Sequence, residues 1–196
     1  DCILEAAERA LRDGETRYTH SQGIFELREA ICEHYLQSCG VDVHPDRVIV
    51  TMGTSAALFV IFAALLNGGE EVVMTDPHYA CYPHFVSFLG ARPVYSPLRA
   101  QDGFIPDPED LRRRVTDRTA AIIVNSPGNP TGAVCDRGTM ERVCGMGVPV
   151  VSDEIYHGLV YGDRGHTALE FTDEAFVLNG FSKRYAMTGW RLGYAI

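Results

Sequence analysis

The sequence predicts an α/β protein built on a layered, mostly parallel β-sheet. Short runs rich in β-branched residues alternate with helical patterns along the 196 residues. Two of these runs, 120–125 and 148–152, are almost continuously apolar, which is typical of strands buried on both faces. No stretch rich in Pro, Gly and Ser divides the chain, so we expect one large domain with at most a small appendage.

The elements follow one another in a nearly regular order. Two helices come first, at 3–12 and 23–38, and an apolar stripe along the second predicts one packed face. The predicted strands are 48–51, 71–75, 92–96, 120–125, 148–152, 175–179 and 193–196, and the helices between them are 54–66, 80–89, 108–115 and 136–144. Helix 54–66 is apolar nearly all round, so we expect it to be deeply buried. Asp107 before Pro108 is typical of a helix N-cap.

Composition excludes several function classes. The 17 basic and 26 acidic residues give a net charge of -9, which argues against nucleic acid as a partner. The longest apolar run, 56–66, has eleven residues, too short to span a membrane. No signal peptide is visible and the six cysteines form no C-x-x-C pair, so we expect free thiols in a cytoplasmic protein. The seven histidines show no metal-ligand spacing, and we expect no metal.

One basic residue stands out from the others. Sixteen of the 17 basic residues are arginine, and Lys183 is the only lysine. Arginine cannot replace lysine where a deprotonated amine is needed, because a guanidinium stays charged. Composition alone leaves two interpretations equally open, a reactive lysine and a surface lysine retained by chance.

Polar and aromatic residues follow five of the predicted strands, at the sheet edge where ligands of open α/β sheets bind. Strand 48–51 leads into Gly53, Thr54 and Ser55 at a helix start, which is either an anion cradle or an ordinary N-cap. Strand 71–75 leads into an aromatic cluster that includes Tyr79, and its position alone favours ordinary aromatic packing over a binding site. Strand 120–125 leads into a turn around Asn129 with two prolines and two glycines.

The remaining two strand ends carry charge. Asp153 follows the buried strand 148–152, where a carboxylate is costly to desolvate without a cationic partner, unless it is simply a helix N-cap. Ser182 and Lys183 follow strand 175–179, and Arg191 comes eight residues after the lysine. The sequence therefore predicts that the single lysine lies at the same sheet edge as the other four segments.

Four motifs in this order resemble the class I/II aminotransferases, which are fold-type-I pyridoxal-phosphate enzymes. They are YTHSQGIFELREA at 18–30, SPGNPTG at 126–132, SDEIY at 152–156 and NGFSKRYAMTGWRLGY at 179–194. The resemblance implies a three-layer α/β/α large domain with a mostly parallel, seven-stranded sheet. It assigns 18–196 to this large domain, incomplete at its C-terminus, and 1–17 to a helix that belongs to the small domain of the family, with the C-terminal small domain absent.

The resemblance also implies a role for each matching residue. Lys183 would form an aldimine with pyridoxal 5'-phosphate (PLP) and later move a proton between substrate and cofactor. Asp153 would keep the pyridine nitrogen protonated. Asn129 and Tyr156 would hydrogen-bond the ring 3-oxygen, and Tyr79 would stack on the ring.

The phosphate of the cofactor has its own set of matching residues, Gly53, Thr54, Ser55, Ser182 and Arg191. Tyr18 matches a tyrosine that reaches the phosphate in the neighbouring subunit, which implies a homodimer with shared active sites.

The implied activity is transfer of an amino group between an amino acid and a 2-oxo acid. Two alternatives stay open, a PLP-dependent C–S lyase or related eliminase of the same fold, and a catalytically incomplete fragment. The chain has about half the family's usual length, and nothing follows the predicted strand 193–196 to cover it, so we expect a fragment with an exposed end strand. Asn129 and Asp153 are 24 positions apart, roughly one helical turn fewer than the family pattern.

Overall fold

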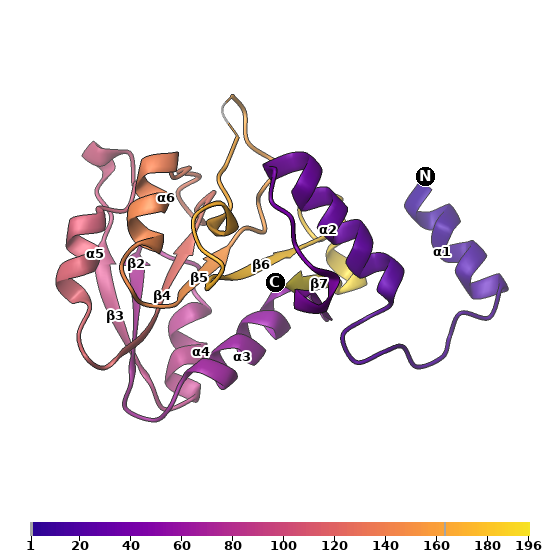
Figure 1. The fold of residues 1–196 in the computed structure, drawn as a ribbon, viewed down its shortest axis with the longest axis horizontal. Helices are drawn as coiled ribbons and strands as arrows, with labels where there is room; N and C mark the ends of the chain where they lie inside the picture. The colour runs from indigo at the N-terminus through magenta and orange to yellow at the C-terminus, as the bar shows by residue number, and fades with distance from the viewer. Residues whose placement is uncertain (1, 163) are drawn as a thin grey trace.

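Seven strands form one mixed sheet in the computed structural model, which describes residues 2–162 and 164–196. The strand order is β1-β7-β6-β5-β4-β2-β3 (Figure 1). Their bounds are β1 Ile49–Thr51, β2 Glu71–Asp76, β3 Arg92–Pro97, β4 Thr119–Asn125, β5 Val150–Asp153, β6 Phe176–Gly180 and β7 Gly193–Ala195. Strand β7 runs antiparallel to β1 and β6, and every other pairing is parallel. The predicted mostly parallel sheet of seven strands is therefore confirmed.

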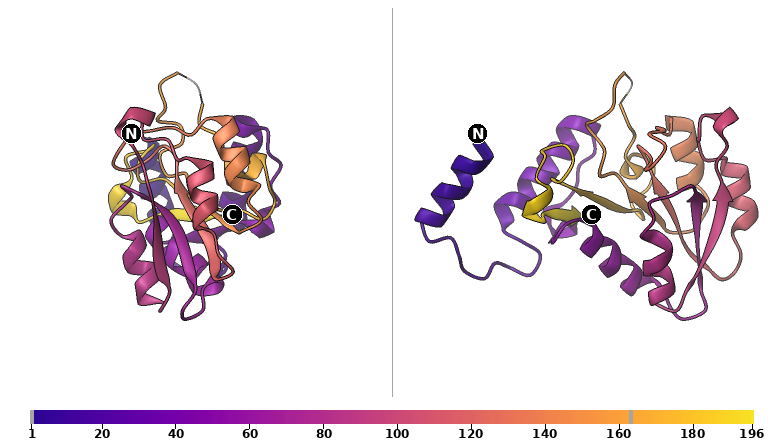
Figure 2. Two further views of the ribbon diagram at one scale, coloured as in Figure 1. Left: turned by 90° about the vertical axis from the view of Figure 1, so that its left-hand side faces the viewer. Right: turned by 180° about the vertical axis from the view of Figure 1, so that it is seen from behind.

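Helices cover both faces of this sheet, as expected for a three-layer arrangement (Figures 1 and 2). The helices are α1 Cys2–Arg12, α2 Phe25–Cys39, α3 Thr54–Leu65, α4 Tyr82–Phe88, α5 Pro108–Arg114 and α6 Arg137–Cys144. Successive residues of β4 point to opposite faces. Ile122 packs into a core with α2, α5 and α6, whereas Ile123 packs into a second core with α3 and α4. The almost continuous apolar run predicted for this strand reflects that double burial.

The helix caps follow the local sequence. The Asp107 side chain accepts a hydrogen bond from the backbone N–H of Glu109, as predicted for an N-cap, at 2.9 Å. Asp136 caps α6 in the same way through the N–H of Thr139, at 2.7 Å. Helix α6 has only eight residues, but Met140 and Val143 are fully buried, so this short helix still covers its part of the sheet.

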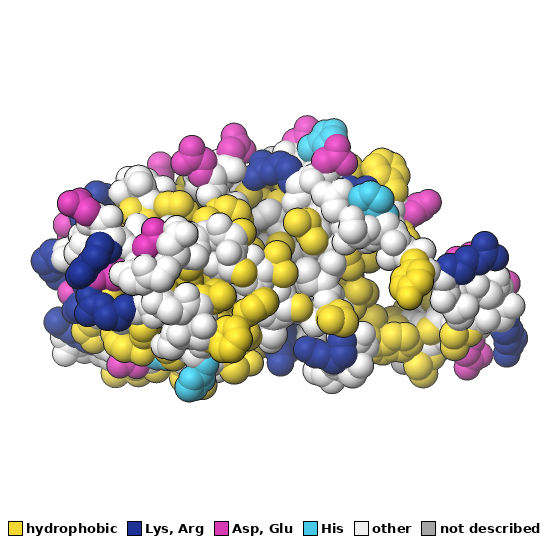
Figure 3. All heavy atoms as spheres, turned by 90° about the horizontal axis from the view of Figure 1, so that it is seen from below, with side chains coloured by type: hydrophobic (Ala, Val, Ile, Leu, Met, Phe, Trp, Pro, Cys, Tyr) yellow, Lys and Arg dark blue, Asp and Glu magenta, His cyan; other side chains and the backbone are white. Residues whose placement is uncertain are grey.

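The prediction that α3 is deeply buried is only half right. Leu58 and Phe62 are buried against the sheet, whereas Phe59 is 37% and Val60 51% exposed. A helix on the outer layer of a sheet buries one face, and the other face of α3 is only partly covered by the described residues. Phe59 contacts Phe85 and Phe88 of α4 at ring-centroid distances of 6.3 and 6.0 Å. Hydrophobic side chains are visible on the side of the molecule seen in Figure 3.

The expectation of an exposed end strand at 193–196 is wrong. Strand β7 lies inside the sheet between β1 and β6, and all three of its residues are buried. The edge strands are β1 and β3. The chain reverses direction after β6 and inserts β7 antiparallel, which position along the sequence does not reveal.

The N-terminal segment extends away from the sheet. Helix α1 has no buried residue and stands apart from the body in Figures 1 and 2. The assignment of 1–17 to a separate domain therefore stays a prediction.

The described residues also bear on the predicted absences. All six cysteines are free, as expected. Within 2–162 and 164–196 no helix is long and apolar enough to cross a membrane. The same residues hold no group of three or more His, Cys, Asp or Glu placed to bind a metal ion.

Candidate active site

The loops at one edge of the sheet enclose a cavity of about 200 Å³. Nine of the eleven sequence-predicted site residues line it, namely Thr54, Ser55, Tyr79, Asn129, Asp153, Tyr156, Ser182, Lys183 and Arg191. These residues come from five separate loops, and the parallel strands bring the loops together at their carboxyl ends. The two exceptions are Gly53, which lies directly against Arg191, and Tyr18, which is fully exposed and lines no part of the cavity.

Asp153 dominates the electrostatics of the cavity. It ends β5 and is 6% exposed. The Tyr82 hydroxyl donates to its Oδ2 at 2.6 Å, and the backbone N–H of Ile155 donates to its Oδ1 at 3.2 Å. Burial raises the pKa of Asp153, although these two hydrogen bonds oppose the shift. No described residue forms an ion pair with it, so the cavity contains a buried carboxylate without an ion-pair partner.

A chain of amide contacts fastens the turn at 126–132 to this carboxylate's strand. Asn125 donates from Nδ2 to the backbone carbonyl of Asp153 at 2.8 Å. Its Oδ1 accepts from the backbone N–H of Asn129 at 2.6 Å. The Asn129 Nδ2 in turn lies 3.5 Å from the Tyr156 hydroxyl. Asn129 and Tyr156 thus present neighbouring polar groups at one wall of the cavity.

An anion cradle forms the opposite wall, where β1 leads into α3. Gly53 precedes α3 with φ +81° and provides no side-chain cap, so the first N–H groups of the helix stay available. A Cβ atom on Gly53 would lie 2.8 Å from Nη2 of Arg191. The guanidinium therefore packs directly against the backbone at the helix start, where a larger residue would have to displace it and the positive φ favours glycine. Arg191 Nη1 also donates to the carbonyl of Thr188 at 2.9 Å.

Lys183 enters the cavity from the loop after β6. Its Nζ lies 5.9 Å from the ring centroid of Tyr156, and it forms no ion pair with a described carboxylate. Tyr79 provides an aromatic wall and packs edge-to-face on Tyr82 at 5.5 Å between ring centroids. The amine, the buried carboxylate and the cradle thus surround one space.

This arrangement selects a particular kind of ligand. Asp153 favours a group that carries a positive charge or a proton, and the cradle at Arg191 favours an anion. Tyr79 suits a flat ring, and the unpaired amine of Lys183 suits a carbonyl.

Four lining residues were not singled out from the sequence. They are Tyr82, Asn125, Ile155 and Thr188. Tyr82 belongs to the aromatic cluster after β2, and its hydroxyl contact with Asp153 joins residues 71 positions apart. Asn125 is the last residue of a predicted strand. In the sequence, Tyr82 and Asn125 could be noticed only as polar side chains at a strand end or in a loop. The fold is needed to show which atoms they contact.

Comparison with known proteins gives a consistent result. The family pattern described as "Aminotransferase class I and II" matches residues 1–196. A probable aspartate/prephenate aminotransferase of Aquifex aeolicus is 43% identical over 203 residues, covering 99% of this chain and 52% of that protein. The aspartate/prephenate aminotransferase of Thermus thermophilus is 43% identical, covering 98% and 51%.

Solved structures agree with these relatives. The aspartate aminotransferase from Thermus thermophilus with maleate superposes with a TM-score of 0.96 at 42% identity, covering 98% of this chain and 52% of that one. An alanine aminotransferase from Pyrococcus furiosus gives a TM-score of 0.95 at 40% identity, with coverage of 98% and 51%. The chain spans about half the length of the curated relatives it matches.

Proposed function

Because the chain belongs to the class I and II aminotransferase family, we propose that it is the cofactor-binding part of a PLP-dependent aminotransferase. The reaction would exchange an amino group between an amino acid and a 2-oxo acid. The observation that carries this proposal is the meeting of Asp153, Lys183 and the Arg191 cradle at one cavity. The names of the relatives favour transfer over elimination, and several favour aspartate as the amino donor.

The residues present fit the chemistry of PLP. Its phosphate suits the cradle, in which the missing side chain of Gly53 leaves room for Arg191, together with the hydroxyls of Ser55 and Ser182. Its pyridine nitrogen suits Asp153, whose buried carboxylate has no ion-pair partner among the described residues. When bound, PLP supplies a ring that withdraws electrons from the substrate's α-carbon.

Each residue then has a defined task. Asp153 holds a proton on the ring nitrogen, because a buried carboxylate gains most from an adjacent positive charge. Tyr82 orients that carboxylate through its hydroxyl. Asn129 and Tyr156 hydrogen-bond the ring oxygen. Lys183 would hold the cofactor at its carbonyl, and its amine would supply the base that moves a proton at the substrate's α-carbon.

We further propose that the complete enzyme is a homodimer. Tyr18 lies on the extended segment between α1 and α2 and is fully exposed, which fits a side chain that serves a neighbouring subunit. The six free thiols favour a reducing, cytoplasmic compartment.

Borohydride reduction tests the cofactor site directly. The purified chain is incubated with PLP, reduced, digested and mapped by mass spectrometry. Since Lys183 is the only lysine, only this residue and the N-terminal amine can be labelled. We expect one phosphopyridoxyl group on Lys183. Labelling of the N-terminus alone, with a folded chain by circular dichroism, would contradict the proposal.

Two variants sharpen the test. Arg191→Gln should reduce labelling of Lys183 at low PLP concentration, because it removes the cationic part of the cradle. Arg99→Gln, which removes an arginine that does not line the cavity, should label like the unchanged chain.

A further inference from the structure

A second cavity of about 190 Å³ lies next to the first and shares none of its lining residues. Helix α2 forms one side of it, through residues that include Ala30 and His34. The segment 179–185 forms another side. This segment contributes Ser182 and Lys183 to the candidate active site and five other residues to the second cavity, so it separates the two.

One end of the second cavity is basic. His34, His157 and Arg184 converge there from three different parts of the chain. Nη1 of Arg184 donates a hydrogen bond to Nε2 of His34 at 3.4 Å, and this imidazole is neutral because a guanidinium can only donate. Burial, with the nearby charges of Arg184 and His157, lowers the pKa of His34.

Negative charge at this end is scarce among the described residues. Glu154 lies 3.3 Å from Nδ1 of His157, and its other contacts are with Ser152, Thr167 and the N–H of Ala168. Within 2–162 and 164–196, Arg184 forms no ion pair.

The Arg184 side chain is exposed to solvent, but it packs against the backbone on one side. A Cβ atom on Gly158 would lie 2.8 Å from Cδ and Cζ of Arg184, so its side chain packs directly on the backbone there. The Cζ atom also lies 5.6 Å from the ring centroid of Tyr185. A positioned guanidinium loses less entropy on binding an anion than a mobile one does.

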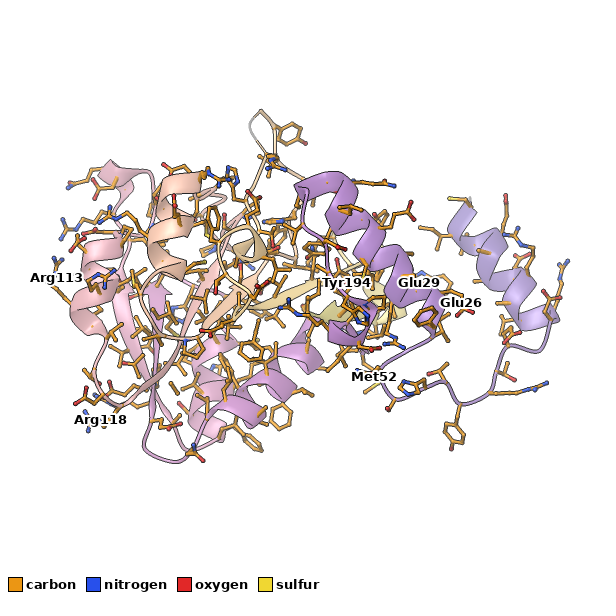
Figure 4. All side chains as sticks on the ribbon, viewed as in Figure 1. Glu26, Glu29, Met52, Arg113, Arg118 and Tyr194 are labelled. Atoms are coloured by element: carbon orange, nitrogen blue, oxygen red, sulfur yellow. The ribbon has the colours of Figure 1, made fainter. Side chains whose placement is uncertain are left out.

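The rest of the cavity is apolar. Leu27 and Ile31 of α2 face Phe181 and Tyr194 across it, and the rings of Phe181 and Tyr194 are 5.9 Å apart at an interplanar angle of 61°. Tyr194 lies between β7 and α2 in Figure 4. An apolar slot that ends in a fixed cation matches a carboxylate with an apolar body. The volume is below the roughly 300–1,000 Å³ of sites for drug-sized ligands, so the ligand must be small.

We propose that this second cavity binds a small carboxylate whose aromatic or branched aliphatic body packs against Phe181 and Tyr194 and whose carboxylate pairs with Arg184. The bound carboxylate would also lie beside His34. The site is distinct from the proposed cofactor site, and its occupation requires neither PLP nor Lys183.

Three probe molecules separate the contributions of charge and of apolar body. Phenylacetate carries both, 2-phenylethanol lacks the charge, and acetate lacks the ring. We expect phenylacetate to bind the purified chain saturably by isothermal titration calorimetry, and the other two to bind at least tenfold more weakly. Equal binding of phenylacetate and 2-phenylethanol, or no saturable binding of phenylacetate, would overturn the proposal.

Two arginine variants locate the bound molecule. Arg184→Gln should weaken phenylacetate binding at least tenfold, and Arg191→Gln, in the candidate active site, should leave it within twofold. The reverse pattern would place the carboxylate in the first cavity and refute the second site. Ala30→Trp, which fills the second cavity without changing charge, should also abolish phenylacetate binding. If Arg184→Gln lowers the melting temperature, the result for Ala30→Trp decides whether the second cavity is the binding site. Because no step uses PLP, failure here is independent of the borohydride result.

Discussion

Asp153 is costly to the folded chain as long as no cation lies beside it. Burial raises the pKa of its carboxyl, which means that folding disfavours the charged form. At neutral pH the unfolded chain carries this carboxylate ionised in water, so the site opposes folding. A bound cofactor that brings a protonated nitrogen would offset this cost. The Asp153 carboxylate therefore lowers the stability of the chain without cofactor but strengthens cofactor binding.

The variant Asp153→Asn tests this opposition. Removing the buried charge should raise the melting temperature of the chain without cofactor at pH 7, because the desolvation cost disappears. The same change should weaken PLP binding at least tenfold, which is about 1.4 kcal/mol. Thermal denaturation and an absorbance titration with PLP measure the two effects. A fall in both would indicate a structural rather than an electrostatic role for Asp153.

Tyr82 holds the Asp153 carboxylate in its charged form. Its hydroxyl hydrogen bond lowers the pKa that burial raises. In Tyr82→Phe the pKa of Asp153 should rise further, so that the carboxylate becomes protonated at a higher pH. The midpoint at which PLP is lost on acidification should therefore move upward. Tyr161→Phe, at a fully exposed tyrosine, is the control and should leave this midpoint unchanged. An unchanged midpoint in Tyr82→Phe would show that the hydroxyl does not affect the Asp153 carboxylate.

Among the elements, the three strands at one side of the sheet share an ionic joint with a buried carboxylate and two exposed arginines. Glu71 begins β2 and is 1% exposed. It pairs with Arg92 of β3, and with Arg118 just before β4 at 2.7 Å. Arg118 is labelled in Figure 4. The Thr116 hydroxyl donates to Oε2 of Glu71 at 2.9 Å. The joint therefore connects β2 with both of its neighbours.

Replacing Glu71 should loosen this joint. Because the Arg92 and Arg118 side chains are 64% and 66% exposed, solvent screens these pairs, and Glu71→Gln should lower the free energy of unfolding by about 1 kcal/mol. The hydrogen bond from Arg92 is the main cause that lowers the pKa of Glu71. The stabilisation should thus be present above the unfolded pKa of glutamate and should disappear as the pH falls through the folded value. Urea denaturation at pH 7 and pH 3 measures this, and the exposed Glu174→Gln should show neither effect.

Helix α6 depends on its cap. The N–H of Thr139 is the main cause of the lowered pKa of Asp136. Asp136→Ala should reduce stability by about 1 kcal/mol, whereas Asp117→Ala, in the turn before β4, should change it by less. Chemical denaturation of both variants distinguishes a cap from a general loss of charge.

At the scale of the whole molecule, one side of the helical layer is uncovered. Phe59, Val60 and Phe88 are 37%, 51% and 78% exposed and lie on α3 and α4. Contiguous apolar patches of this kind promote association. The chain therefore has an exposed apolar surface on α3 and α4 through which copies could associate.

A charge on this surface should reduce association. Phe88→Glu is expected to increase the monomer fraction in size-exclusion chromatography at micromolar concentration, with little change in melting temperature, because Phe88 contributes little to the buried core. Phe62→Glu, in contrast, should unfold the chain, since Phe62 is fully buried. An unchanged elution profile for Phe88→Glu would show that association uses another surface.

The sequence by itself determined the layers and most of the site. The alternation of apolar runs at 120–125 and 148–152 with amphipathic helices predicts a parallel sheet, because strands buried on both faces have no polar side. Ligand residues at strand ends could be predicted for a related reason. Parallel strands all end at one edge, so residues as distant as Thr54 and Lys183 meet there whatever the details of packing. The single lysine, Lys183, also indicated a reactive amine, which arginine cannot replace because its guanidinium stays charged.

Only the tertiary structure decided which groups touch. The position of β7 inside the sheet depends on a chain reversal after β6 that no local pattern encodes. The uncovered face of α3 depends on what lies outside the helix, not on its own residues. The Tyr82 contact with Asp153 and the meeting of His34, His157 and Arg184 join segments far apart in the chain. Such contacts depend on distances of a few ångströms between packed elements, and hydrophobic periodicity carries no information about them.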